Sequence, residues 1–185
     1  MFQRIRTRLA VGALRLGKQK LVRRLVRQQD GTAAVEFAFV AAPFLLLLFA
    51  ILQTAIVFFA GQALETAVAD SARLIMTGQA QTQGLTQSTF KDEVCKKIYG
   101  LFDCGKMFVD VRTFTNFSYS LPSPLDSDGK VDNNVLYQPG NAGDIVVVRL
   151  MYPLSVYANA IGLANMANNQ RLLVATAVFR NEPYQ

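Results

Sequence analysis

The sequence predicts an α+β protein in which a long N-terminal helix, transmembrane in its first half, carries a small outer domain of about three antiparallel strands and short helices. Three observations support this fold class. Residues 37–64 form a run of 28 residues without a charge. An amphipathic helical pattern follows this run directly, and three β-rich segments come later in the chain. The 185 residues leave room for one such domain beside the helix.

The basic residues are concentrated before the apolar run. Residues 1–30 hold nine of the 19 Lys and Arg residues and one acid, Asp30, so this leader has a net charge of +8. The other 155 residues hold ten basic and twelve acidic side chains, a net charge of −2. By the positive-inside rule, the leader is cytoplasmic and the chain after about residue 65 lies outside. Nucleic-acid binding is the alternative for a basic tail. Because the leader adjoins a membrane helix and lacks interleaved aromatic residues, we expect no nucleic-acid partner.

The first half of the helix is long enough to span a membrane. About 20 apolar residues cross the hydrocarbon core, whereas a secretory signal has an apolar stretch of only about 7–15 residues. We therefore expect a lipid-embedded helix at roughly residues 37–60, within a transmembrane segment at 32–62. Pro43 is expected to bend this helix or to loosen its hydrogen bonds. Gln53 and Thr54 are candidates for hydrogen bonds to another helix or for local ones.

The helix is expected to continue outside the membrane as segment 63–80. Beyond the membrane run, apolar residues recur at helical spacing, at Leu64, Val68, Ala72 and Ile75. We expect this stripe to pack against the outer domain. Gly78 and the polar stretch 79–89 are expected to end the helix.

The outer domain, residues 81–185, contains one further helical pattern and three β-rich segments. The helical spacing covers residues 90–102. The predicted strands are 107–114, 144–153 and 172–179. The segment 117–143 is rich in Ser, Pro, Asp, Asn and Gly, which is typical of a long loop. An Ala/Asn/Leu segment around 153–168 is a candidate for a short helix.

The residue types argue against an enzyme. The chain has no His and only two Cys residues. It therefore lacks the Ser-His-Asp and Cys-His catalytic arrangements, zinc sites with His or four Cys ligands, and a proximal His for haem. Carboxylate or Lys chemistry is the remaining catalytic option. We expect no enzymatic activity and no cofactor.

Cys95 and Cys104 are the candidates for a disulfide. They lie in the predicted outer region, where thiols become oxidised, and their number is even. Closing a loop of about ten residues contributes roughly 2–3 kcal/mol to stability in the chain-entropy model. Two separate buried thiols are the alternative.

Asp126, Asp128 and Asp132 are weak candidates for calcium ligands. The segment that contains them, DSDGKVD, resembles part of a calcium loop. It lacks the third alternating ligand before Gly129 and the closing Glu of an EF-hand. Because Asp and Gly are common turn formers, we expect a turn and no metal.

The junction between leader and helix carries the most specific motif. Residues 30–37 read DGTAAVEF. A basic leader that ends in Gly, followed by four residues and then by Glu and an aromatic residue that open an apolar helix, resembles a type IV prepilin processing site. Together with the stretch ALETAVADSAR at 63–73, this makes residues 20–78 similar to the TadE-like family of the Tad (Flp) pilus system. The Cys pair and the Arg-Asn-Glu-Pro ending at 180–183 agree less specifically.

This resemblance implies roles for four residues. A prepilin peptidase would cut after Gly31, where the missing side chain lets a protease approach the backbone, and would leave Thr32 as the new N-terminus. Glu36, with Phe37 at the start of the apolar run, would act in assembly, because a carboxylate in a membrane is costly and favours a partner. In pilins that partner is thought to be the N-terminal amine of the same or a neighbouring subunit. The alternative is that Glu36 lies among the headgroups without a partner.

The resemblance also implies a function. The chain would be a minor pilin or pseudopilin of a Tad pilus that contributes to assembly, as initiator or tip subunit, and to adhesion. Its partners would be the prepilin peptidase, other Tad pilins and pseudopilins, the inner-membrane assembly platform and the lipid bilayer. It would cross the bacterial inner membrane once, with a cytoplasmic N-terminus and a periplasmic C-terminal domain, and would be a candidate for incorporation into the extracellular pilus. The alternative is an uncleaved, signal-anchored envelope protein with a binding head domain.

Overall fold

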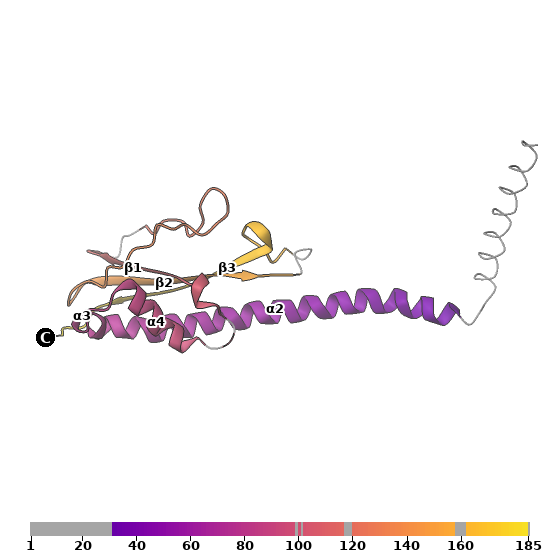
Figure 1. The fold of residues 1–185 in the computed structure, drawn as a ribbon, viewed down its shortest axis with the longest axis horizontal. Coiled ribbons are helices and arrows are strands. Elements are labelled where there is room, and N and C mark those ends of the chain that lie inside the picture. The colour runs from indigo at the N-terminus through magenta and orange to yellow at the C-terminus, as the bar shows by residue number, and fades with distance from the viewer. Residues whose placement is uncertain (1–30, 99, 101, 117–119, 158–161, 185) are drawn as a thin grey trace, which may run out of the picture. The chain divides into compact units, whose positions relative to one another are not determined.

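The computed structural model describes residues 31–184, apart from 99, 101, 117–119 and 158–161. The predicted basic leader therefore lies outside the described residues. The chain divides into two compact units, residues 1–48 and 49–185. The second unit contains the helix–sheet domain, which we call the head domain, and Figure 1 shows its elements.

The helix α2 spans Thr32–Met76, a length of 45 residues. At 1.5 Å rise per residue it is about 68 Å long. The predicted segments 32–62 and 63–80 together give this long helix, which begins at the predicted residue and ends four residues earlier, shortly before Gly78. Pro43 lies inside the helix. It has no N–H to donate, so one helical hydrogen bond is missing at this turn.

The head domain is built on a three-stranded antiparallel sheet. Its strands are β1 (Phe108–Phe114), β2 (Ile145–Ser155) and β3 (Gln170–Arg180), in the order β1-β2-β3. All three lie at the predicted positions, which confirms the α+β fold class. In the first pairing Asp110 lies opposite Arg149. The unpaired edge of β1 is covered by the following loop, because Val111 N–H donates to Leu136 O at 2.8 Å.

The main core lies between the inner face of this sheet and the second part of α2. The predicted stripe of α2 is buried as expected, and Leu64 and Ile75 are 1% and 0% exposed. The buried face of α2 begins closer to the N-terminus than predicted, because Val57 and Ala60 are buried as well. The sheet and a short helix, α4 (Gln87–Lys97), contribute Phe90, Val94, Val109, Val111, Val146, Val148, Leu150, Tyr152, Leu173 and Ala175.

Two short helices follow α2. Gly78 adopts a left-handed conformation (φ 77°) and separates α2 from α3, Gln79–Thr82. The next helix, α4, spans Gln87–Lys97 and is capped by Thr86. Thr86 Oγ1 accepts from the backbone N–H of Thr89, and Thr89 Oγ1 accepts from that of Thr86. These reciprocal bonds satisfy donors in the first turn.

The predicted helix at 90–102 is misplaced by several residues. It begins earlier because the Thr86 cap fixes its first turn at Gln87. It ends earlier because Ile98 is already extended (φ −110°, ψ 100°) and Gly100 has φ +74°. After α4 the chain reverses direction so that Cys104 reaches Cys95, and a helix that continued to residue 102 would prevent this.

The predicted short helix around 153–168 is wrong in its described part. Strand β2 continues through Pro153 to Ser155, and the other helical residues described there belong to a 3₁₀ turn, Ala167–Asn169. Pro153 is compatible with a strand because β1 begins at Phe108, which pairs with Met151. Beyond Met151, strand β2 pairs with β3 alone, so Pro153 occupies an edge position where its missing N–H is tolerated.

The loop between β1 and β2 covers the outer face of the sheet. Figure 1 shows α2 on one side of the sheet and this loop on the other. A small second core forms beneath the loop from Val131, Met151 and Leu172. The described part of segment 117–143 has no regular strand or helix, as predicted for a loop.

Candidate functional site: the N-terminal helix and its contacts

Gly31 and Thr32 lie at the start of α2. The helix begins at Thr32, directly after Gly31, and both residues are exposed. A Cβ added to Gly31 would meet no atom within 4 Å, and its φ is not in the left-handed region. The described fold therefore gives no steric reason for a glycine at this position. At Gly78, in contrast, an added Cβ would overlap the ring of Tyr184.

Glu36 and Phe37 follow one turn later on the same helix. Both are exposed, and Phe37 is 74% accessible. Glu36 forms no ion pair with any described residue. A partner from outside the described chain therefore has access to its carboxylate.

The first part of α2 is apolar on all sides. It is long and apolar enough to cross a membrane, and its most apolar stretch makes no buried contacts. Such a helix needs lipid or other apolar helices around it. Its exposed large apolar residues are Val35, Phe37, Phe39, Val40, Phe44, Leu45, Leu46, Leu47, Leu48, Phe49, Ile51, Leu52, Ile56, Phe58 and Phe59.

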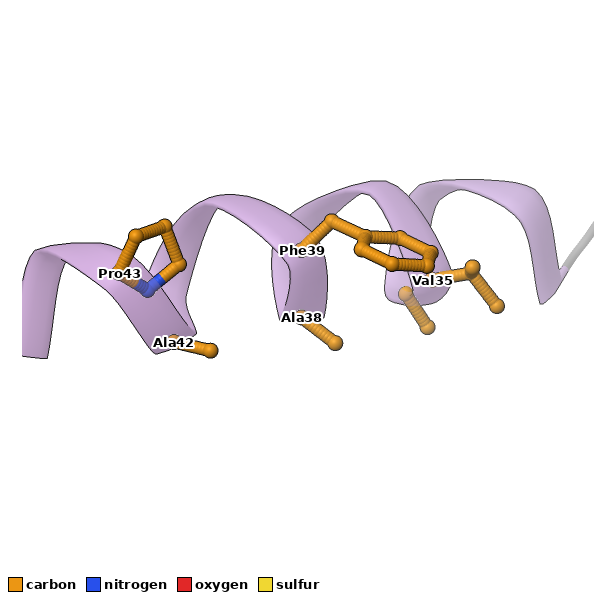
Figure 2. A pocket seen from close by; sticks show the side chains of 6 residues that line it. Val35, Ala38, Phe39, Ala42 and Pro43 are labelled. Atoms are coloured by element: carbon orange, nitrogen blue, oxygen red, sulfur yellow. The ribbon is translucent and has the colours of Figure 1, made fainter.

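A shallow apolar groove lies on this helix before residue 48. Figure 2 shows the Ala38 and Ala42 side chains on one edge and the Phe39 ring above them. Ala34, Val35 and Pro43 complete the lining. Small residues four positions apart let another helix approach closely in a membrane.

Gln53 and Thr54, the polar pair within the apolar run, are bonded within the chain. Thr54 Oγ1 donates to Ala50 O at 2.8 Å, which is the local alternative. Gln53 Oε1 accepts from the backbone N–H of Tyr157 at 3.4 Å. Gln53 therefore bonds to its own head domain.

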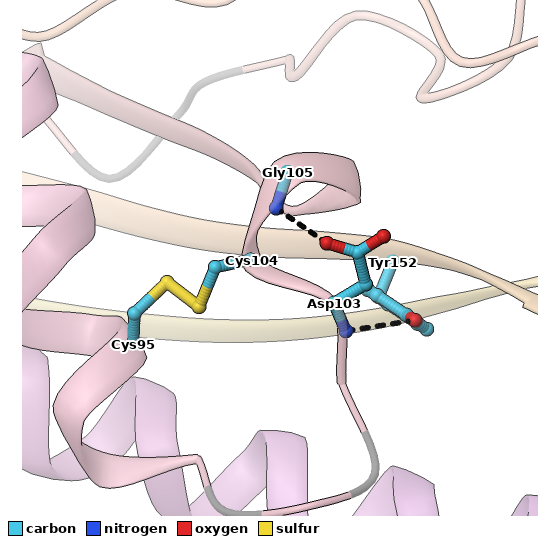
Figure 3. Close-up of a disulfide and its surroundings, with 5 residues drawn as sticks. All are labelled: Cys95, Asp103, Cys104, Gly105 and Tyr152. Atoms are coloured by element: carbon cyan, nitrogen blue, oxygen red, sulfur yellow. Dashed lines mark hydrogen bonds between the residues drawn. A yellow bond between two sulfur atoms is a disulfide. The ribbon is translucent and has the colours of Figure 1, made fainter.

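Cys95 and Cys104 form a disulfide with a Cα–Cα distance of 5.9 Å. Figure 3 shows how it joins the end of α4 to the turn before β1. Next to it, the Asp103 N–H donates to the Tyr152 hydroxyl at 3.1 Å. Asp103 Oδ1 accepts from Gly105 N–H at 2.9 Å. The disulfide and these hydrogen bonds attach α4 to the sheet.

The carboxylates of the predicted calcium loop form turns. Asp126 Oδ1 accepts from the N–H groups of Asp128 and Lys130, at 2.9 and 2.8 Å. Asp132 Oδ1 accepts from Asn134 N–H at 2.9 Å. Within the described ranges, no three His, Cys, Asp or Glu residues are placed to hold a metal ion. The turn chemistry predicted from the sequence is present, and calcium binding stays untested.

A buried charge cluster on the outer face of the sheet was missed by sequence reasoning. Asp110 is 1% exposed and Arg149 is 5% exposed. Arg149 Nη2 donates to Asp110 Oδ2 at 2.8 Å, and Arg112 Nε donates to both oxygens at 3.0 Å. The charged residues inside the segments VDVR and VVRL were the available signal. The strand register that pairs them was unknown.

This cluster fastens the loop between β1 and β2. Asp110 Oδ1 accepts from Leu136 N–H at 2.9 Å. Arg149 Nη1 donates to Pro122 O at 2.9 Å, and Arg112 Nη2 donates to Asn134 O at 2.6 Å. The cluster is therefore structural: it links loop backbone to sheet.

Comparison with known families gives a match to the N-terminal helix. Residues 31–73 match the family model described as TadE-like protein. This confirms the TadE-like resemblance over the junction, the apolar helix and most of the buried stripe. No curated protein and no solved structure matches the chain.

Proposed function

From the TadE-like segment at residues 31–73, we propose that the protein is a minor pilin or pseudopilin of a Tad (Flp) type IV pilus system. A prepilin peptidase processes it. It then contributes to pilus assembly, as initiator or tip subunit, and to adhesion. The TadE-like family is a structural, pilin-like family, and we assign the chain no catalytic role.

The observation that carries the proposal is the position of Gly31. It is the first residue of the family match and immediately precedes α2. It is a glycine that the described fold does not require. Cleavage after Gly31 removes the leader of charge +8 and leaves the amine of Thr32 at the first residue of the helix. Glu36 then lies four residues later, on the same helix face as that amine.

The apolar surface of α2 can be buried in two successive surroundings, first in lipid and then among other helices. In the inner membrane it is surrounded by lipid, with the N-terminus cytoplasmic and the head domain periplasmic. In the pilus or its initiating complex, the helices of other pilins and pseudopilins replace the lipid. The Glu36 carboxylate is then neutralised by the N-terminal amine of the same or a neighbouring subunit, because an unpaired charge in that apolar surrounding is costly.

The head domain supplies the contacts that distinguish this subunit from others. It is attached to α2 through the buried stripe and is closed by a disulfide. Because the second part of α2 belongs to the core of the head, the position of the helix in an assembly also determines the position of the head. The assembly platform and neighbouring heads are the expected partners.

The test is assembly in a host strain that lacks the native chain. We expect wild-type protein to restore piliation, and the Glu36→Gln variant to be processed but to restore little of it. The matched control is Glu65→Gln, an exposed Glu on the same helix whose carboxylate accepts from Gln62. Full piliation with Glu36→Gln would refute the assembly role of Glu36. Unchanged piliation in the strain without the chain would refute a role in pilus assembly and favour the uncleaved envelope protein.

A further inference from the structure

The head domain begins to cover α2 inside the apolar run. Leu52 and Ile51 are 51% and 61% exposed. At the next residue, Gln53 Oε1 accepts from Tyr157 N–H. Val57, four residues further on, is only 7% exposed and lies on the face of the helix that the head covers. The head therefore reaches the helix within the segment expected to be in the membrane.

Tyr157 occupies the end of the head that lies nearest to this point. Val156, directly before it, is 2% exposed, and its N–H donates to Asn169 O at 3.0 Å. Tyr157 itself is 91% exposed. A fixed backbone thus holds an aromatic ring in the open beside an apolar helix. Tyr has an apolar ring and a polar hydroxyl, and it concentrates where hydrocarbon meets water.

The length of the helix places this ring at the outer membrane surface. The twenty residues from Glu36 to Ile56 rise about 30 Å, the thickness of the hydrocarbon core. With Glu36 at the inner boundary, the outer boundary lies at Ile56. The headgroup layer beyond it is about 5–7 Å thick on each side. Gln53 lies about 5 Å inside the boundary along the helix, so the backbone of Tyr157, whose N–H donates to Gln53, lies next to this layer.

The residues on the exposed side of α2 agree with an outer membrane boundary near Ile56. Phe58 and Phe59 are 70% and 65% exposed on the side that the head leaves open. They lie 2 and 3 residues beyond Ile56, about 3–5 Å into the headgroup layer. Further along the helix, the exposed residues Gln62, Glu65 and Thr66 are polar. The exposed apolar surface of α2 therefore ends at Phe59, about 9 Å along the helix from Gln53.

We propose that the head domain rests on the outer surface of the membrane, with the side chain of Tyr157 in the lipid headgroup layer. This inference rests on the proposed function, because it requires α2 to span a membrane. It narrows the membrane span to about residues 36–56, compared with the predicted 32–62. No helical stalk separates the head from the lipid. Removing the subunit from the membrane during assembly then breaks a second lipid contact besides that of the helix.

The chain contains no Trp, so variants with one introduced Trp report on single positions. We would reconstitute the full chain into vesicles whose phospholipids carry bromine either high or low on the acyl chain, and measure Trp fluorescence. The test variant is Tyr157→Trp. Leu46→Trp, at a position 71% exposed in the middle of the span, reports on insertion of the helix. Val178→Trp, on the exposed face of β3, is the control for the part of the head far from the membrane. Val178 lies about 27 Å along the strand from Gln170, which pairs with Ser155 at the Tyr157 end of the sheet.

The three variants give distinguishable results. We expect the fluorescence of Tyr157→Trp to be quenched more by the shallow bromine than by the deep one. We expect that of Leu46→Trp to be quenched more by the deep bromine, and that of Val178→Trp to be unquenched.

Three outcomes would overturn the inference. If Leu46→Trp is quenched and Tyr157→Trp is not, the head does not rest on lipid and this inference fails, while membrane anchoring stands. Stronger quenching of Tyr157→Trp by the deep bromine also contradicts a headgroup position. If Leu46→Trp is unquenched, the membrane anchoring in the proposed function fails as well.

Discussion

The carboxylate of Asp110 and the guanidinium of Arg149 meet at 2.8 Å across β1 and β2, and both are buried. The two residues lie directly opposite each other in the strand register. Arg112, two residues along β1 on the same face, binds the same carboxylate. One buried carboxylate thus forms ion pairs with two guanidinium groups and also accepts a hydrogen bond from the loop that crosses above them.

Asp110→Ala is expected to destabilise the head domain strongly. It leaves two guanidinium groups without their acid beneath a loop, and removing one partner of a buried ion pair costs about 3–5 kcal/mol. The measurement is the free energy of unfolding of the full chain in detergent, followed by circular dichroism. The control is Glu93→Ala, which removes the exposed pair with Lys96 and should change stability little. Equal effects of the two variants would contradict the role of the cluster.

Gly78→Ala is expected to cost more stability than Gly84→Ala. Both glycines have positive φ, 77° and 62°, so either alanine adds backbone strain of about 1–2 kcal/mol. At Gly78 the new methyl group would also overlap the Tyr184 ring, whereas at Gly84 it would meet nothing within 4 Å. Unfolding of both variants checks this. Combining Gly78→Ala with Tyr184→Ala should recover part of the difference, and a double variant with no recovery would contradict the steric cause.

Replacing both Cys95 and Cys104 by Ser is expected to lower the free energy of unfolding by about 2–3 kcal/mol. The disulfide closes a loop of sequence separation 9, which restricts the unfolded chain. A reductant should lower the melting temperature of the wild-type chain and leave that of the double variant unchanged. A wild-type chain that is insensitive to reductant under denaturing conditions would contradict the bond.

The stability of the head domain is expected to fall in alkaline solution through Tyr137. Burial raises the pKa of Tyr137 to about 12 from its ordinary value of 10.0. The unfolded chain therefore loses this proton first, so the contribution of neutral Tyr137 is complete below pH 10 and is lost as the pH rises toward 12. Tyr137→Phe should weaken this dependence. Unfolding free energies measured from about pH 8 to about pH 12 test it, and identical slopes for the two chains would contradict the prediction.

The same variant should cost little stability near neutral pH. The Tyr137 hydroxyl is buried and has no hydrogen-bond partner among the described residues. Its ring packs against Phe90 with centroids 5.5 Å apart, and a Phe ring retains this contact. Removing an unsatisfied hydroxyl is therefore close to neutral.

The elements with a strong local pattern were predictable from sequence. The stripe from Leu64 to Ile75 repeats at helical spacing because its residues share one buried face, and β-branched runs marked the strands. The end of α4 was not predictable, because the return of the chain to Cys95 decides it. The continuation of β2 to Ser155 was not predictable either, because the position of Pro153 in the strand depends on where β1 begins.

The candidate site likewise contains residues that a local pattern identifies and a contact that no local pattern predicts. Gly31, Thr32, Glu36 and Phe37 were identified because a linear motif defines them, and the structure adds that all four are exposed at the start of α2. The contact between Gln53 and Tyr157 joins residues about a hundred positions apart. No local pattern encodes it, just as none encodes the pairing of Asp110 with Arg149.

The central claim is that the working subunit begins at Thr32, and the intact mass of the protein from native membranes tests it most directly. The comparison includes Gly31→Ala and, as the matched control, Gly61→Ala, since an added Cβ meets nothing within 4 Å at either glycine. We predict that the wild-type and Gly61→Ala chains have lost residues 1–31, while Gly31→Ala retains them. A full-length wild-type chain in cells with an active prepilin peptidase would contradict the claim.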